Sequence, residues 1–248
     1  MKKEPFITTG VLIAAWWILA AAVHNDVLIP SPWQTLIYLG RLLTEKEFYV
    51  SVGASLWRVG CGFALSLLTA LFCSILCSEF PAFRRYFEPV RILTKTIPNV
   101  TYIIIAVIWL GSEGAAATVS FMILFPVFMN GFLNALDAEH ALMKDVDAVY
   151  PETLSVKIRT RILPSLAMEI LRTGKTAASL GFKVGVMAEI LGSVQTGIGR
   201  RLNYCRMYLL TDGILAWTIV IILISICIDH LFDYLIERNV KEEQGWKN

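Results

Sequence analysis

Long apolar runs alternate with short polar segments along this chain. A helix that crosses the roughly 30 Å hydrocarbon core of a bilayer needs about 20 apolar residues, whereas a barrel strand needs only about ten. The runs are too long for barrel strands, so the pattern predicts membrane-spanning helices. The six predicted spans are 6–23, 52–77, 97–111, 115–136, 166–191 and 213–236. We therefore expect an all-α integral membrane protein with six transmembrane helices.

The composition agrees with a membrane-embedded chain. Of 248 residues, 56% are hydrophobic and 17% are charged, and the mean hydropathy is +0.62. These values lie outside the usual range for a soluble domain. The net charge of +2 does not favour a nucleic-acid partner. The five cysteines are odd in number and indicate neither a disulfide framework nor a metal site.

The first apolar run has a second interpretation as a secretion signal. Lys2 and Lys3 precede it, and Ala20, Ala21 and Ala22 resemble a cleavage site. However, the run is long for a signal core, and its removal would leave an odd number of spans. We therefore expect residues 6–23 to be the first span.

The distribution of basic residues predicts the orientation, because lysine and arginine near helix ends are retained in the cytoplasm. With six spans and both termini in the cytoplasm, 15 of the 22 lysines and arginines lie on that side and 6 lie outside, with Lys183 inside the fifth span. Three arginines of one outer loop, Arg200, Arg201 and Arg206, oppose this trend. The majority nevertheless favours cytoplasmic termini.

A polar insert, 137–165, separates the fourth and fifth predicted spans and ends in Leu163-Pro164. Pro151 restricts the preceding residue and is well tolerated in the first turn of a helix, and Glu152 places an acid where the helix dipole favours it. The segment therefore predicts a cytoplasmic helix-turn-helix. The alternative is a solvated loop with no partner.

The insert resembles the loop by which permeases of bacterial ABC importers bind their ATPase. The family pattern is Glu-Ala-Ala, three residues, Gly, nine residues and Ile-x-Leu-Pro. The spacing is kept here, with Asp145, Pro151 and Arg161 at the positions of Glu, Gly and Ile. Val146 and Asp147 replace the two alanines, so we expect a matched ATPase partner.

Other segments extend the resemblance over nearly the whole chain. They are Leu28-Ile29-Pro30-Ser31-Pro32, Ile97-Pro98-Asn99 with Trp109-Leu110-Gly111, Ala188-Glu189-Ile190-Leu191-Gly192, Gly197-Ile198-Gly199 and Leu210-Thr211-Asp212. In this order they resemble the permease family of nitrate, sulfonate and taurine importers. The resemblance implies one permease domain, 1–248, with the insert as its coupling loop, in the inner membrane of a bacterium.

The resemblance also implies the partners. They are an ABC ATPase dimer, which would hold ATP and magnesium, a second permease copy or a sister permease, a periplasmic or lipid-anchored binding protein, and membrane lipids. This chain itself would bind no cofactor. The residues expected to couple to the ATPase are Asp145, Val146, Asp147, Ala148, Tyr150, Pro151, Glu152, Leu163 and Pro164.

Polar residues inside the spans are candidates for the transport pathway, because a charge near the bilayer centre is costly unless paired or hydrated. Lys183 would suit an anionic substrate, although a structural pair with an acid elsewhere is the alternative. Glu189 is six residues away and faces another direction, so an intrahelical pair is not expected. The resemblance implies an acid at Glu189 that stabilises the outer gate. Asn130 and Asn134 could line the pathway or bond between helices.

The sequence contains no phosphate-binding loop, zinc-protease motif or nucleophile elbow. We therefore expect a non-catalytic chain. Asp229, His230 and Asp233 could suggest a metal site, but a hydrated helix end is the preferred interpretation. The alternative functions are an ATP-independent transporter or channel, which would usually show matching broken helices in its two halves, and a membrane-embedded enzyme.

Overall fold

The computed structural model describes residues 4–150 and 152–245, and every regular element in this part of the chain is helical. The α-helices are α1 (Glu4–Val23), α2 (Pro32–Leu42), α3 (Lys46–Glu79), α4 (Pro81–Thr96), α5 (Asn99–Val149), α6 (Leu154–Lys157), α7 (Leu163–Gly192), α8 (Ile198–Met207) and α9 (Thr211–Gly245). A π-helical turn, η1 (Ile158–Ile162), joins α6 to α7. The predicted all-α class is confirmed.

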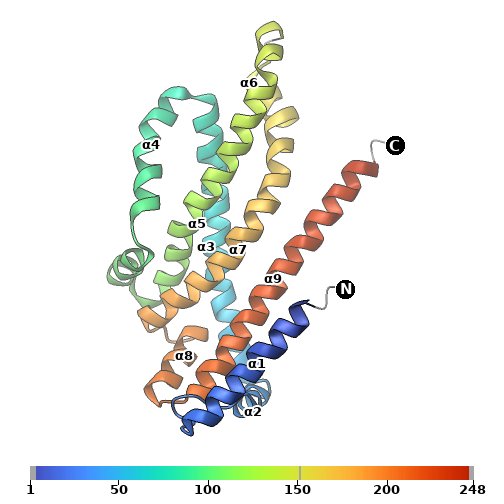
Figure 1. The fold of residues 1–248 in the computed structure, drawn as a ribbon. Coiled ribbons are helices and arrows are strands. Elements are labelled where there is room, and N and C mark those ends of the chain that lie inside the picture. Colours follow the sequence, from blue (N-terminus) through green and yellow to red (C-terminus); the bar gives the residue numbers. More distant parts are fainter. Residues whose placement is uncertain (1–3, 151, 246–248) are drawn as a thin grey trace.

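The long helices lie side by side and run alternately up and down (Figure 1). α5 packs against both α3 and α7, and α7 also packs against α9, so α5 and α7 form the centre. The end that carries α6 is called the insert end, and the end that carries α2 and α8 is called the α8 end. The turn from α3 to α4 lies at the insert end in the same view.

Three helices in the described part of the chain are long and apolar enough to cross a membrane. They are Lys46–Glu79, Asn99–Met143 and Thr211–Asn239, and Ile7–Val23 is a shorter apolar helix. The fifth predicted span, 166–191, lies in α7, which is not one of the three. Lys175, Lys183 and Glu189 lower its mean hydropathy, and packing against α3, α5, α8 and α9 compensates by enclosing much of this helix.

The third and fourth predicted spans, 97–111 and 115–136, form one element, α5, with a break at Gly111. Gly111 has φ 70° and ψ 177°, a conformation that glycine adopts without the steric cost of a side chain. The segment before the break folds back, so that Ile103 and Ala106 are buried beside Ala116 of α5 and Ala188 of α7. The two predicted runs therefore lie in one helix and are separated by the break at Gly111, and their division into two membrane spans stays a prediction.

The insert is more helical than a loop. α5 continues as far as Val149, a short turn follows, and α6, η1 and α7 continue the chain with Leu163-Pro164 at the start of α7. The observed order is a helix, a turn and a second helix. η1 runs into α7 without a break, so its π-helical turn lies directly before Pro164, which has no N–H to donate to the preceding turn.

Close helix packing depends on a missing side chain at Gly62 in α3. A Cβ at this position would lie 2.4 Å from the Ala117 carbonyl oxygen and 2.7 Å from Ser120 Cβ of α5. Small residues allow such approach between membrane helices. By contrast, a Cβ at Gly60, half a turn away, would meet nothing within 4 Å.

We expect Gly62→Ala to lower the free energy of unfolding by about 1–3 kcal/mol, because overpacking forces the backbones of α3 and α5 apart. Gly60→Ala is the matched control and should leave stability nearly unchanged. Thermal unfolding of both variants in detergent, followed by circular dichroism, measures the difference. Equal melting temperatures would show that α3 and α5 leave room for a methyl group at position 62.

Candidate functional site

Glu189 is fully buried near the α8 end of α7. Its Oε2 accepts hydrogen bonds from Ser55 Oγ at 2.6 Å and from the Gly199 backbone N–H at 3.0 Å. Its Oε1 accepts a hydrogen bond from Arg58 Nη1 at 2.9 Å. Burial of a carboxylate is very costly unless it is paired and hydrogen-bonded. Both conditions are met here, so Glu189 ties α3, α7 and α8 together.

Arg58 links Glu189 to a second carboxylate. Arg58 Nη2 donates to Glu113 Oε2, two residues after the break in α5, and Arg58 Nη1 also donates to the Thr196 carbonyl oxygen at 2.7 Å. Glu113 Oε1 accepts a hydrogen bond from the Gln195 backbone N–H at 2.7 Å. We call Ser55, Arg58, Glu113 and Glu189 the Glu189 cluster. It joins α3, α5 and α7 and holds the loop that precedes α8.

The Gly197-Ile198-Gly199 motif brings the backbone of this loop against Glu189. Gly197 has φ 133°, where a side chain is strained, and a Cβ at Gly199 would lie 2.3 Å from Glu189 Cβ. The Ile198 backbone N–H donates to Ser55 Oγ at 2.9 Å. The motif is therefore needed for the hydrogen bonds that enclose the buried carboxylate.

Sequence reasoning selected Glu189 but missed Arg58 and Glu113. Arg58 is one of the six basic residues counted on the outer side, but it lies in the outer part of the second predicted span, where a charged residue is itself a signal of a functional or structural partner. Glu113 lies between two predicted spans and carried no comparable signal. Only the folded chain brings their side chains together.

Lys183 lies away from the Glu189 cluster. Its side chain is exposed, and Met187 and Leu191 continue the same exposed stripe of α7 at intervals of four residues. Among the described residues the Lys183 ammonium has no hydrogen-bonding partner. A charge at this position is therefore available to a solute or to a second protein chain.

Asn130 and Asn134 of α5 have different surroundings. Asn130 Nδ2 donates to the Pro126 carbonyl oxygen at 2.6 Å, and its Oδ1 accepts a hydrogen bond from Arg91 Nη2 of α4 at 3.2 Å. Asn134 is exposed. Asn130 is thus engaged in bonding between helices, whereas Asn134 is open to a partner or to solvent.

The end of α5 exposes large apolar side chains. We define the tip as Leu142, Met143, Val146, Val149 and Tyr150. Their exposed fractions are 80%, 36%, 50%, 67% and 72%, respectively. The spacing of three and four residues places several of them on one stripe of the helix. An exposed apolar stripe beside charged groups is typical of a surface that binds another protein.

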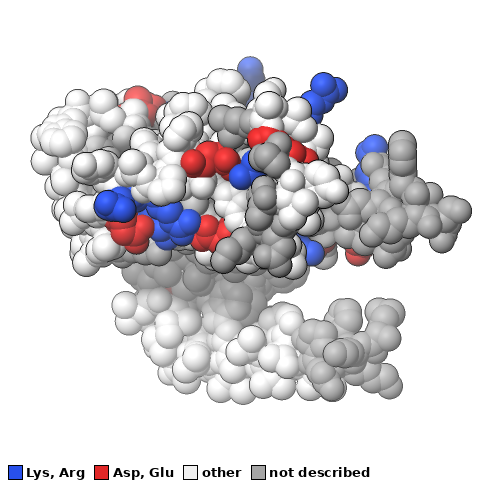
Figure 2. Space-filling model, turned by 90° about the horizontal axis from the view of Figure 1, so that it is seen from above, with Lys and Arg blue, Asp and Glu red and all other residues white. Residues whose placement is uncertain are grey.

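A cluster of ion pairs lies at the insert end, between α3, α5 and the α6–η1 segment. Lys157 Nζ lies 2.9 Å from Glu79 Oε1 of α3, and Arg161 Nε donates to Glu139 Oε1 of α5 at 2.7 Å. His140 Nε2 lies 3.2 Å from Glu79 Oε1 and 3.8 Å from Glu139 Oε2. We call these five residues the insert cluster. Figure 2 shows this end of the molecule, where acidic and basic side chains lie next to one another.

The insert cluster connects the α6–η1 segment to α3 and α5. The side chains of Glu79, Glu139, Lys157 and Arg161 are only 11–16% exposed, so their ion pairs are largely shielded from water. At the same end, a bidentate pair between Arg84 and Asp137, at 2.6 and 2.8 Å, joins α4 to α5. The second helix of the insert is therefore held to the long helices by charge as well as by chain connection.

We expect Arg161→Ala to destabilise the insert by about 1–3 kcal/mol, since it leaves the shielded Glu139 carboxylate without its main partner. Hydrogen exchange of 150–162 should then accelerate, while exchange in α9 should not change. Arg159→Ala is the control, because Arg159 is an exposed neighbour in the same turn. The exchanged pair Glu139→Arg with Arg161→Glu should restore protection, and its failure to do so would argue against a specific pair.

The structure describes only some of the other residues that were predicted to couple to the ATPase. Pro151 lies outside the described residues, as do the side chains of Asp145, Asp147 and Ala148, although the backbones of these three belong to α5. Glu152 is exposed, and its Oε2 lies 3.7 Å from Arg161 Nη1. Leu163 and Pro164 are exposed at the start of α7. Leu142, Met143 and Val149 were missed, although their apolar spacing in a polar insert was a usable signal.

The acidic residues near the end of α9 pair with α7. Asp233 Oδ1 accepts a hydrogen bond from Lys175 Nζ at 2.6 Å, and Asp229 Oδ1 accepts one from Ser179 Oγ at 2.5 Å. No group of three metal-ligating side chains was found among the described residues. These aspartates therefore have a structural explanation in helix pairing.

Comparison with known proteins gives several relatives. The chain is 24% identical over 233 residues to the taurine transport system permease protein TauC of Escherichia coli, which covers 90% of this chain and 83% of TauC. It is 26% identical over 243 residues to a "Probable ABC transporter permease protein" of Haemophilus influenzae, covering 95% and 96% of the two chains. It is 27% identical over 131 residues to the formylaminopyrimidine transport permease protein ThiX of Halalkalibacterium halodurans, covering 52% of each.

No protein-family model matches the chain. The similarity to TauC and to the Haemophilus protein nevertheless extends over most of each pair of chains, and both relatives are described as permease proteins. An all-helical structure with long apolar helices agrees with that description. In its sequence, this chain is similar to the permease proteins of ABC transporters.

Proposed function

We propose that this chain is the membrane permease subunit of an ATP-driven, binding-protein-dependent importer and that its tip binds a separate ATPase. The observation that carries this proposal is the exposed apolar tip at the end of α5, supported from below by the insert cluster. A surface of this kind transmits force only if it binds the partner protein and is firmly attached to the helices that move. The tip provides the first property, and the shielded ion pairs provide the second.

In this proposal the chain crosses the membrane six times. α1, α3, α7 and α9 each cross once, α4 together with the segment of α5 before Gly111 crosses once, and α5 after Gly111 crosses once. The alternating directions of the long helices support this count (Figure 1). The insert end then faces the cytoplasm of a bacterium, both termini lie on that side, and the α8 end faces outside, as the distribution of basic residues indicates.

The transported solute is proposed to be small and anionic. Lys183 supports this, because its exposed ammonium lies in the central helix α7 without a protein partner among the described residues. An ammonium can form charge-assisted hydrogen bonds with an anion, and a sulfonate such as that of taurine has suitable charge. A second permease copy would complete the pathway on this face. Glu189 stabilises the gate at the α8 end and does not contact the solute.

ATP hydrolysis belongs to the partner subunit. ATP would close an ATPase dimer, and the two bound tips would then move together. The insert cluster passes this motion to α3 and α5, whose other ends meet at the Glu189 cluster. A binding protein on the outer side would deliver the solute when that end opens.

The test is affinity purification of this chain from its native membranes in mild detergent, followed by mass spectrometry and an ATPase assay. A co-purifying ATPase with a phosphate-binding loop is expected, in an amount comparable with the permease. Cross-linking before solubilisation guards against dissociation in detergent. A chain that purifies alone under both conditions would contradict the proposal and favour an ATP-independent transporter.

A further inference from the structure

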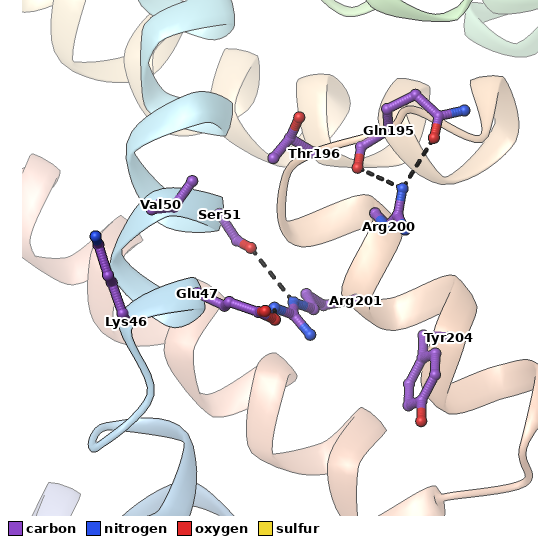
Figure 3. Close-up of a pocket in the computed structure, with 9 residues that line it drawn as sticks. All are labelled: Lys46, Glu47, Val50, Ser51, Gln195, Thr196, Arg200, Arg201 and Tyr204. Atoms are coloured by element: carbon purple, nitrogen blue, oxygen red, sulfur yellow. Dashed lines mark hydrogen bonds and ion pairs between the residues drawn. The ribbon is translucent and has the colours of Figure 1, made fainter.

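A hollow with a cavity volume of about 500 Å³ lies at the α8 end, between the start of α3, the loop before α8 and α8 itself (Figure 3). The lining residues are Lys46, Glu47, Val50, Ser51, Gln195, Thr196, Arg200, Arg201 and Tyr204. Three of these are basic and one is acidic. We call this cavity the basic hollow.

The positions of the arginines are unusual for the side that they occupy. Arg200 and Arg201 belong to α8, which the proposed orientation places outside the membrane, where basic residues are normally depleted. Two adjacent arginines on the outer side therefore need another explanation. The hollow offers one, because its arginines can bind negatively charged groups from the outer solution.

Both arginines are held in place by polar partners. Arg200 Nη1 donates to the Gln195 backbone oxygen at 2.6 Å and to its Oε1 at 2.9 Å, so its partners there are neutral. Arg201 donates to Glu47 Oε2, and its Nε lies 3.4 Å from Ser51 Oγ. Glu47 therefore offsets one of the three positive charges. Figure 3 shows Arg201 directed towards Glu47, and Arg200 towards Gln195.

We propose that the basic hollow is a docking site for an acidic patch on a soluble protein outside the membrane. This inference rests on the proposed function, in which a binding protein approaches this end. Arginine forks pair well with carboxylates, and arginine and tyrosine are enriched where proteins meet. The exposed ring of Tyr204 lies at the edge of the hollow and adds an apolar contact.

The loop that forms one wall of the hollow is also held by the Glu189 cluster. Gln195 holds Arg200 through its carbonyl and side-chain oxygens, while its backbone N–H donates to Glu113. The next residue, Thr196, accepts a hydrogen bond from Arg58. A carboxylate that draws Arg200 away from Gln195 therefore acts on the loop that Arg58 and Glu113 hold. Docking at the hollow is in this way connected to the buried Glu189.

The experiment places the photocross-linker benzoylphenylalanine at Tyr204 in the full chain, in its native membrane. After irradiation, mass spectrometry identifies the adduct and the peptide attached to it. We expect an adduct with a soluble protein, at a peptide that contains Asp or Glu. The double change Arg200→Glu with Arg201→Glu should lower the yield at least about tenfold. Arg206→Glu is the matched control, because Arg206 is exposed on the same helix but does not line the hollow.

Glu47→Gln provides a change in the opposite direction. It removes the acid that offsets Arg201, so the adduct yield should rise, a result that misfolding would not give. An adduct with phospholipid alone, no adduct, or an equal loss with Arg206→Glu would each overturn the proposal. If the ATPase still co-purifies in that case, only the docking site is wrong. Absence of the ATPase would instead contradict the proposed function.

Discussion

Arg58→Met is expected to lower the free energy of unfolding by about 3–5 kcal/mol, because it leaves the buried carboxylate of Glu189 without its cationic partner. Glu189 is fully buried, and the Arg58 side chain is only 13% exposed. Water therefore cannot replace the lost guanidinium without opening the α8 end. Ser55 and the Gly199 N–H would remain, but neutral donors only partly offset a buried charge. Thermal unfolding in detergent, followed by circular dichroism, measures the loss.

Arg206→Met is the control for Arg58→Met, since it removes the same charge from an exposed position at the same end. The double change Arg58→Met with Glu189→Gln should recover most of the stability, because a neutral amide is far less costly to bury. If Arg58→Met loses no more than Arg206→Met, the Arg58 guanidinium does not stabilise the buried carboxyl group of Glu189. The Glu189 cluster would then not stabilise the α8 end through charge.

Val146→Asp is expected to weaken binding of the ATPase by at least about 2 kcal/mol, or ~30-fold, because it places a charge in the middle of the apolar tip. Val146 is 50% exposed, so the change should not disturb the packing of α5. The ratio of ATPase to permease after affinity purification measures the effect. ATPase activity of the purified complex should fall in proportion.

Leu209→Asp is the matched control for Val146→Asp. Leu209 is 68% exposed at the α8 end, and its φ of 54° suits aspartate better than leucine. This variant should bind the ATPase as the unchanged protein does. Equal binding by both variants would show that the tip is not the docking surface. Loss of binding in both would indicate a general effect of added charge on insertion or folding.

The helices could be predicted because the length and hydropathy of each apolar run can be read from a short stretch of sequence. An apolar run of sufficient length must be helical in lipid, whatever its neighbours are, since the backbone has no water to bond with. The runs in α3 and α9 illustrate this, because both are recognised by length and hydropathy alone. α7 was located for the same reason, although Lys175, Lys183 and Glu189 make it too polar to stand out among the described helices.

The contacts at the two ends were much less predictable. Glu189 was chosen as a gate residue from its motif, but its partner Arg58 lies 131 positions earlier in the chain. The pair of Arg161 with Glu139 joins two helices across a turn whose direction the sequence does not specify. Charges can pair in many ways along a chain, so periodicity and spacing do not select one.

The sequence by itself determined the helical class, the positions of the long apolar segments and the polar insert that ends in Leu163-Pro164, because each depends on local composition and hydrogen bonding. Only the tertiary structure decided that Gly111 breaks one helix in two and that Arg58 links the buried Glu189 to Glu113. It also decided that shielded ion pairs hold the insert to the long helices. These features depend on the approach of distant segments, and that approach follows from packing of the whole chain.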